Sequence, residues 1–334
     1  MVEVLSVPFD LCGPHHGSRL GSLAMELAGL LPALDRIGVQ ATVSSVVPVN
    51  GDLPGPRRNC DARALEVYAE TRDRVARAIE GGNSPVVIGG DHSLAIGSIS
   101  GALKVYGDDL AVVWIDAHMD ANTPDTSPSG NLHGVPLGAL THLEPRTAVD
   151  EHDQNHKPWI KDVYGLWPDL LRLVPGHGLK KGNVCWVGLR DVDAGEVENL
   201  KRLPGSLAMT MQDIDTNGLT SVIRKVDEWL IKSKAKAVWI SFDVDVLDPV
   251  FAPGTGTAVR GGLTYREGHL LAESLHNLFN RPDRPYSLAG LDVVEVNPLR
   301  DRDNSTAQVA VEWVCSFFGK SILHAEDPGR TEGP

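Results

Sequence analysis

Residues 237–249 constrain the fold of this chain more than any other stretch. Residues 237–240 form a short apolar run with a β-branched and aromatic bias, which is typical of a strand buried on both faces of a sheet. The run leads into Asp243 and Asp245, and residues two apart in an extended chain point to the same side. Carboxylates at the end of a parallel strand mark the edge where open α/β sheets bind ligands. An aspartate-rich turn before Pro249 explains this motif alone equally well.

Short apolar runs alternate with helical patterns along the chain. We predict strands at residues 2–8, 41–47, 85–88, 110–115, 184–187, 207–210, 237–240 and 287–294, and helices at residues 23–37, 62–79, 166–173, 219–231, 264–278 and 305–318. Strands that alternate with helices pair in parallel and are covered by helices on both faces. We therefore predict an α/β fold, a three-layer αβα sandwich with a central, mostly parallel sheet. We expect a single domain over residues 1–334, with a flexible tail after about residue 320.

Charge and cysteine content argue against several classes of protein. The 31 basic and 44 acidic residues give a formal net charge of −13, which disfavours nucleic acid as a partner and favours a cationic ligand, although an acidic surface also serves solubility. No apolar stretch reaches the ~20 residues that a membrane helix needs, and residues 1–9 resemble a strand and not a secretory signal. Cys12, Cys60, Cys185 and Cys315 lack metal-finger spacing, so we expect reduced thiols in a cytoplasmic protein.

Two further strands end in residues that can bind metal. The strand predicted at 85–88 leads into Gly-Gly-Asp-His-Ser, and the strand at 110–115 leads into Asp-Ala-His-Met-Asp. The Asp-His pair at 91–92 also suits a helix N-terminus, but burying three such strand ends together is very costly unless cations lie between them. The candidate metal ligands are His92, Asp116, His118, Asp120, Asp243 and Asp245.

These four carboxylates and two imidazoles suit a pair of divalent ions. Oxygen-rich ligation without thiolate argues against structural zinc and favours Mn²⁺. Two such ions about 3.5–4 Å apart can share a hydroxide that is nucleophilic near neutral pH. The residues therefore predict metal-assisted hydrolysis.

The three motifs, at residues 89–93, 116–120 and 241–249, resemble the signatures of the ureohydrolases, the family of arginase and agmatinase. The resemblance extends over nearly the whole chain. It implies two manganese ions per chain, with Asp116 and Asp243 bridging them. The first ion would be held by His92, Asp116, Asp120 and Asp243, and the second by Asp116, His118, Asp243 and Asp245.

The loop after the second motif is similar to the arginase version, which binds the α-carboxylate of arginine. On that resemblance Asn122, Ser129 and Asn131 bind the substrate carboxylate, Asp193 pairs with the α-amino group, and Glu196 is a second acid of that pocket. The resemblance also assigns His133 as proton shuttle or general acid, Glu295 as the carboxylate that orients the guanidinium, Thr257 as a pocket-lining residue, and Asp120 as a proton relay beside the hydroxide. Each residue alone would suit an ordinary polar loop, but their joint spacing favours the functional interpretation.

We therefore predict manganese-dependent hydrolysis of L-arginine to L-ornithine and urea by a metal-bridging hydroxide, in a homo-oligomer of three or six copies. Two alternatives stay open: a ureohydrolase acting on agmatine or guanidinobutyrate, and a non-catalytic ureohydrolase-like scaffold. A mononuclear zinc deacetylase needs fewer ligands and does not explain Asp116, Asp120 and Asp245 together. Departures from the family pattern affect the rim and the fine substrate preference more than the chemistry. They are Gly21-Ser22 where Gly-Pro is expected, Asp125 and Pro128 in the substrate loop, and the long segment 142–182.

Overall fold

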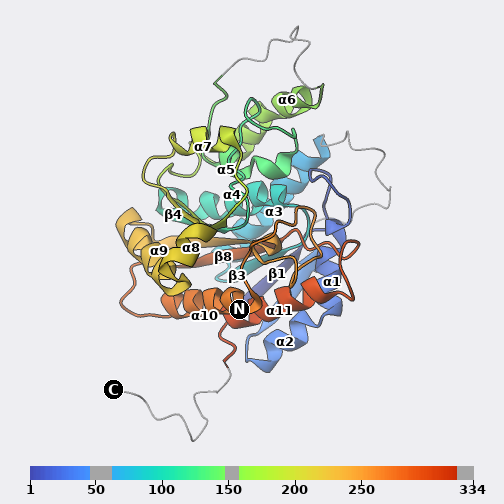
Figure 1. Ribbon diagram of the computed structural model, residues 1–334, viewed down its shortest axis with the longest axis vertical. Helices are drawn as coiled ribbons and strands as arrows, with labels where there is room; N and C mark the ends of the chain where they lie inside the picture. The colour runs from blue at the N-terminus through green and yellow to red at the C-terminus, as the bar shows by residue number, and fades with distance from the viewer. Residues whose placement is uncertain (46–61, 147–157, 322–334) are drawn as a thin grey trace, which may run out of the picture.

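A computed structural model describes residues 1–45, 62–146 and 158–321, and its centre is an eight-stranded sheet (Figure 1). The strands are β1 (Val2–Ser6), β2 (Ala41–Ser45), β3 (Ser84–Ile88), β4 (Leu110–Ile115), β5 (Val184–Leu189), β6 (Leu207–Thr210), β7 (Ala237–Asp243) and β8 (Ser287–Val294). They lie in the order β2-β1-β3-β8-β7-β4-β5-β6, and each neighbouring pair is parallel. The predicted three-layer α/β fold is therefore confirmed. The single-domain extent stays a prediction, and its tail lies almost wholly outside the described residues.

Helices cover both faces of the sheet (Figure 1). One layer contains α3 (Ala62–Glu80), α4 (Ala95–Tyr106), α5 (Pro136–Leu140) and α6 (Pro158–Leu173). The opposite layer contains α1 (Gly21–Leu27), α2 (Leu30–Arg36), α9 (Leu219–Ser233), α10 (Tyr265–Phe279) and α11 (Ser305–Phe317). Two short helices, α7 (Ala194–Leu200) and α8 (Met211–Asn217), follow β5 and β6. Within the described ranges, none of these helices is long and apolar enough to cross a membrane.

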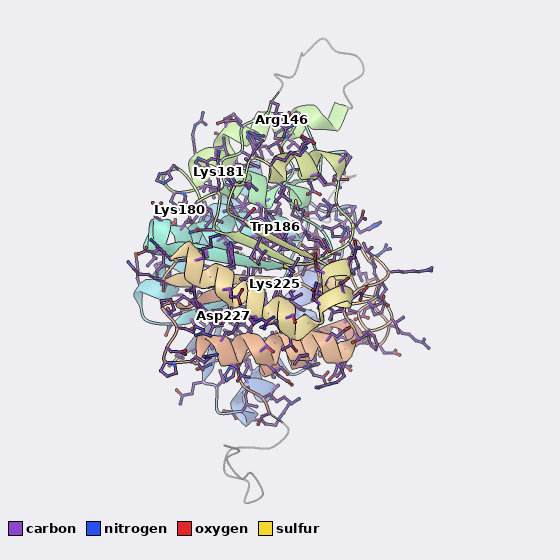
Figure 2. The ribbon with its side chains drawn as sticks, turned by 60° about the vertical axis from the view of Figure 1, so that its left-hand side comes forward. Arg146, Lys180, Lys181, Trp186, Lys225 and Asp227 are labelled. Atoms are coloured by element: carbon purple, nitrogen blue, oxygen red, sulfur yellow. The ribbon has the colours of Figure 1, made fainter. Side chains whose placement is uncertain are left out.

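The strand sequences are continuously apolar because both faces of the sheet are buried. In β4, Val112 and Trp114 pack into the core under α3 and α4, whereas Val113 and Ile115 pack into the core under α9 to α11. Trp186 on β5 lies inside the molecule, while Lys180 and Lys181 in the turn before it are exposed (Figure 2). A separate hydrophobic core packs against each face of the sheet. Together they fix the position of the sheet edge at which the candidate site lies.

Several helices differ from the predictions. The helix predicted at residues 23–37 is interrupted at Gly29, whose positive φ of 85° ends α1 and starts α2. The helix predicted at 166–173 begins earlier, at Pro158. Helices α5, α7 and α8 were not predicted, because helices of five to seven residues span at most two turns and give little periodicity.

The expectation of reduced thiols is wrong for one cysteine. Cys185 and Cys315 are free and buried, but Cys12 is in a disulfide. Sequence spacing does not reveal which cysteines the tertiary structure brings within the roughly 4 Å Cβ separation of a disulfide. The Cys12 main chain also contacts the site, since its N–H donates to Asp91 and its carbonyl accepts from the His133 N–H.

Candidate metal centre and its pocket

The candidate site lies at the carboxyl ends of the four central strands. His92 follows β3, Asp116 follows β4, Asp243 ends β7 and Glu295 follows β8. These strands are adjacent in the order β3-β8-β7-β4, and parallel strands present their carboxyl ends at one edge. Side chains separated by as many as 203 residues in the sequence are therefore neighbours in space.

The first group of candidate ligands surrounds His92. Its Nδ1 lies 2.9 Å from Asp116 Oδ2, 3.1 Å from Asp243 Oδ2 and 3.2 Å from Asp120 Oδ2. All four residues are buried. Within the described chain, His92 Nδ1 nevertheless makes no hydrogen bond. The ring nitrogen and three carboxylates thus converge on one point, as ligands of a cation do.

The second group surrounds His118, whose Nδ1 lies 3.0 Å from Asp245 Oδ2 and 3.3 Å from Asp116 Oδ1. Asp116 therefore directs one oxygen toward each histidine. His92, Asp116 and Asp243 form one group that could hold a metal ion, and Asp116, His118 and Asp245 form the other. The shared Asp116 places the two groups side by side, which is the arrangement of a two-metal site.

The electrostatics of these groups favour bound cations. Burial and the negative charges of Asp245 and Asp116 raise the pKa of Asp243 well above its ordinary value. Burial and the charge of Asp116 likewise raise the pKa of Asp120 to about 6. Crowded, buried carboxylates repel one another, and divalent ions between them would remove that repulsion. The residues present therefore fit two divalent ions, whose identity stays a prediction.

Manganese binding is expected to weaken as the pH falls. Burial lowers the pKa of His92, but the carboxylates of Asp116, Asp120 and Asp243 together raise it well above its usual value. The metal-free protein thus holds a proton that an incoming ion must displace. We expect the apparent Mn²⁺ affinity to increase from about pH 6 to about pH 8. Calorimetric titrations near neutral pH, in two buffers of different ionisation enthalpy, would count the released protons. Equal heats in both buffers would contradict the expectation.

A buried hydrogen-bond chain orients the His92 ring. Its Nε2 lies 2.8 Å from Ser241 Oγ, and Ser241 Oγ donates to Asp292 Oδ1 at 2.5 Å. Asp292 Oδ2 also accepts from Ser98 and Trp239, at 2.6 and 2.8 Å. With Nε2 donating to Ser241, Nδ1 keeps its lone pair for an ion. Ser241 and Asp292 were not predicted to support His92, although Ser241 opens the third motif.

Glu295 and His133 form a pair beside the first group. Glu295 has a positive φ of 62° where it leaves β8, which is uncommon for a residue with a side chain. Its Oε1 accepts from the His92 N–H at 2.9 Å and lies 3.2 Å from His133 Nδ1. Burial lowers the pKa of His133, but the Glu295 carboxylate outweighs it and the net shift is upward. The pair therefore favours a protonated imidazole next to the candidate ligands.

A pocket opens over the ligand groups. The described residues that line it are His118, Asp120, Asn122, Ser127, Ser129, His133, Gly134, Asp191, Asp193, Glu196, Asp243 and Thr257. This part of the lining holds five acids and no lysine or arginine, so the pocket suits a cationic ligand. Ser127 and Asp191 were not predicted as site residues, although Asp191 stands two residues before Asp193 in the same motif.

The predicted substrate residues do not all reach this pocket in the same way. Asn122 Nδ2 donates to Asp193 Oδ2 at 3.0 Å, so these two form one polar wall. Thr257 Oγ1 donates to the candidate ligand Asp245 at 2.9 Å. Ser129 lines the pocket, but Asn131 does not, and the Asn131 N–H donates to Ser129 Oγ at 3.2 Å.

Glu196 is tied to the protein by both oxygens. Oε1 accepts from the Ala121 N–H at 3.0 Å and Oε2 accepts from the Asp193 N–H at 2.9 Å. Burial and the charge of Asp120 raise its pKa to about 8. Glu196 thus holds the pocket wall together and has no free oxygen atom directed only at a ligand.

Fold and site together define a class of protein. This class is an α/β protein with a metal centre: it gathers two largely buried His/Asp groups, each able to hold a metal ion, at the carboxyl edge of a parallel sheet. The chain belongs to the arginase family of ureohydrolases, since it matches that family over residues 1–319. The predicted family membership is confirmed.

Individual relatives agree with this assignment. The chain is 36% identical over 329 residues to an arginase of Staphylococcus aureus (strain MRSA252), covering 96% of this chain and 98% of that protein. The crystal structure of arginase from Bacillus subtilis superposes with a TM-score of 0.79 at 33% identity, covering 97% and 100% of the two chains. The native structure of arginase from Bacillus caldovelox gives a TM-score of 0.79 at 34% identity, covering 96% and 99%.

Proposed function

We propose that this protein is a manganese-dependent arginase, which hydrolyses L-arginine to L-ornithine and urea. One observation carries the proposal: the pocket over the two ligand groups is lined by acids, and its described lining has no lysine or arginine. L-Arginine carries a guanidinium at one end and an α-ammonium at the other, so both ends complement that lining. The arginases that are about 36% identical over nearly the whole chain support the choice.

The ligand set is assigned in this proposal as the resemblance implies. One ion would be held by His92, Asp116, Asp120 and Asp243, and the other by Asp116, His118, Asp243 and Asp245. Divalent ions in such a site supply an activated water near neutral pH and stabilise negative charge. Asp120 would also relay a proton beside that water, as the resemblance implies.

Glu295 and His133 act on the substrate itself. Glu295 uses Oε1 for the His92 N–H and for His133, which leaves Oε2 to orient the guanidinium. His133 turns Nδ1 toward Glu295, so Nε2 carries the proton that the departing amine of ornithine takes. The carboxylate of Glu295 keeps this imidazole protonated for the transfer.

The opposite wall binds the amino-acid end. Asp193 pairs with the α-ammonium, and Glu196 holds Asp193 in place by accepting from its N–H. An amide nitrogen has two hydrogens, so Asn122 can donate one to Asp193 and the other to the α-carboxylate. Ser129 offers a hydroxyl to the same carboxylate, and Asn131 holds Ser129 in place.

Urea release from L-arginine, agmatine and guanidinobutyrate tests the proposal. Agmatine lacks the α-carboxylate and guanidinobutyrate lacks the α-ammonium, so each leaves part of the wall unpaired. Such sites reject analogues by ~10⁴ or more, but water in this open pocket can replace the missing group. We therefore expect arginine to be preferred by about 10²–10³ in kcat/KM. Equal or faster turnover of agmatine would overturn the arginase assignment.

Asp193→Asn refines the same test. This change keeps the shape of the side chain but removes the charge, so arginine should lose far more kcat/KM than guanidinobutyrate, which has no ammonium. Asp215→Asn on the exposed side of α8 is the matched control and should leave both substrates unchanged. An equal loss on both substrates would contradict the ammonium contact.

We further infer that the protein assembles into trimers or hexamers and acts in the cytoplasm, without nucleic-acid or membrane partners, as the resemblance implies. Leu23 and Leu27 are 50% and 77% exposed on one face of α1, and Val43 on the edge strand β2 is 52% exposed. Large apolar side chains that are this exposed are candidates for a protein interface. Sedimentation equilibrium at micromolar concentration would contradict the assembly by returning the monomer mass of 35.9 kDa.

A further inference from the structure

Helix α7 lies directly against the substrate loop that follows β4. Gly195 at its start faces Thr126, and a Cβ atom built on Gly195 would lie 2.6 Å from Thr126 Cβ. Such a distance is impossible for a real side chain, so glycine permits this close approach. Helix α7 is thus seated on the loop that carries Asn122 and Ser129.

Two side chains of α7, one turn apart, hold both polar groups of Ala121. Glu196 Oε1 accepts from the Ala121 N–H at 3.0 Å, and Asn199 Nδ2 donates to the Ala121 carbonyl at 2.9 Å. Asn199 Nδ2 also lies 3.2 Å from Thr126 Oγ1. Asn199 and Ala121 are fully buried, so no bulk water reaches this contact. Residues three apart on a helix share a face, so two side chains of α7 can bind the N–H and the carbonyl of the same residue.

The orientation of the Asn199 amide is set from outside the loop. Arg202 NH1 donates to Asn199 Oδ1 at 3.1 Å, and Arg202 NH2 donates to the Glu144 carbonyl at 2.6 Å. Because a guanidinium only donates, the oxygen of the amide must face Arg202. Its nitrogen is therefore directed at Ala121.

The two hydrogen bonds to Ala121 affect different neighbouring residues. The Ala121 N–H belongs to the peptide plane shared with Asp120, a candidate metal ligand. The Ala121 carbonyl belongs to the plane shared with Asn122, and the two atoms of a plane move together. Glu196 therefore fixes the peptide that joins Ala121 to Asp120, and Asn199 fixes the peptide that joins Ala121 to Asn122. Asn122 is further placed by its N–H, which donates to the Gly134 carbonyl at 3.2 Å.

We propose that Asn199 is a positioning residue for substrate specificity: its amide fixes the Ala121–Asn122 peptide and thereby aims Asn122 at the α-carboxylate of the substrate. The inference rests on the proposed function and extends it to a residue outside the pocket. The Asn199 side chain hydrogen-bonds to Ala121, Thr126 and Arg202, and it is not part of the described pocket lining. Its loss is expected to act on substrate binding, and not on metal binding or on the chemical step.

The test compares Asn199→Leu with Asn199→Asp in the full-length, manganese-loaded protein. Leucine has a similar volume without an amide, and aspartate has the same shape but places an oxygen against the Ala121 carbonyl. Both should raise KM for arginine by about 10-fold, since small misplacements of a binding group are costly, and should leave kcat within about two-fold. Bound manganese per chain should stay as in the unmodified protein. Val197→Ala, at a 47% exposed position of α7, is the control and should change nothing.

The outcomes separate this inference from the proposed function. An Asn199→Asp variant with unchanged KM would overturn the inference, because it would show that only the shape of residue 199 matters. A kcat loss with parallel loss of manganese in both variants would also overturn it. The substrate profile of the unmodified protein decides the proposed function separately. If that profile favours agmatine, the arginase assignment fails. The Asn199 variants should then have an unchanged KM for agmatine, because agmatine has no α-carboxylate for Asn122 to bind.

Discussion

Replacing Asp116 by alanine is expected to remove both metal ions and to abolish urea release. Asp116 is the one residue that both ligand groups share, with Oδ2 facing His92 and Oδ1 facing His118. Its loss leaves each group one carboxylate short in a buried site. We expect turnover to fall ~10³-fold or more, which corresponds to a barrier at least ~4 kcal/mol higher. Metal analysis of the purified variant, alongside a urea assay, measures both effects.

Three comparisons make this result specific. Asp116→Asn keeps the size of the side chain and so covers the case in which alanine disturbs folding. Asp215→Ala removes an exposed acid that belongs to neither ligand group nor the described pocket lining, and it should leave the metal content unchanged. Asp243→Ala should also lose both ions if Asp243 bridges, as the resemblance implies. Asp243 Oδ2 lies 3.1 Å from His92 Nδ1, so retention of one ion per chain would limit Asp243 to the His92 group. Two ions retained in Asp116→Ala would refute the shared-ligand assignment.

The second large effect is expected for His133→Asn, which should lower kcat by ~10²–10⁴ while both ions stay bound. His133 belongs to neither ligand group, and its imidazole lies beside Glu295 at the pocket wall. Removing it takes away the proton for the departing amine but none of the atoms that face the ions. A loss in kcat at constant metal content would therefore assign a chemical role.

The pH profile of kcat provides the decisive measurement. The Glu295 carboxylate raises the pKa of His133 above its usual value, so an acid role predicts that activity declines as the pH rises through that raised pKa. The decline should be absent in His133→Asn. His177→Asn is the control, since its side chain is 80% exposed and pairs with Asp108 at the surface. Unchanged turnover of the His133 variant across the pH range would exclude His133 from the mechanism.

The sequence alone predicted the layered sheet and the composition of its carboxyl edge. Runs such as residues 110–115 and 237–240 are apolar throughout because both faces of a parallel strand are buried. Chain direction then determines that whatever follows each strand meets at one edge. His92, Asp116 and Asp243 could therefore be placed at one edge without any knowledge of strand order, because parallel strands all end at the same edge of the sheet. The assignment of the substrate residues depended instead on the family resemblance.

Only the tertiary structure decided how the pocket wall is supported. Helix α7 spans two turns, too few for its periodicity to be recognised, and Asn199 has no motif of its own. The side chains of Glu196 and Asn199 meet Ala121, 75 and 78 residues earlier in the chain. The Cys12 disulfide and the Ser241–Asp292 support of His92 were missed for the same reason. The local hydrophobic pattern indicates which face of a helix or strand is buried. Contacts between distant loops depend instead on how the packed helices place them, and no short window of sequence contains that information.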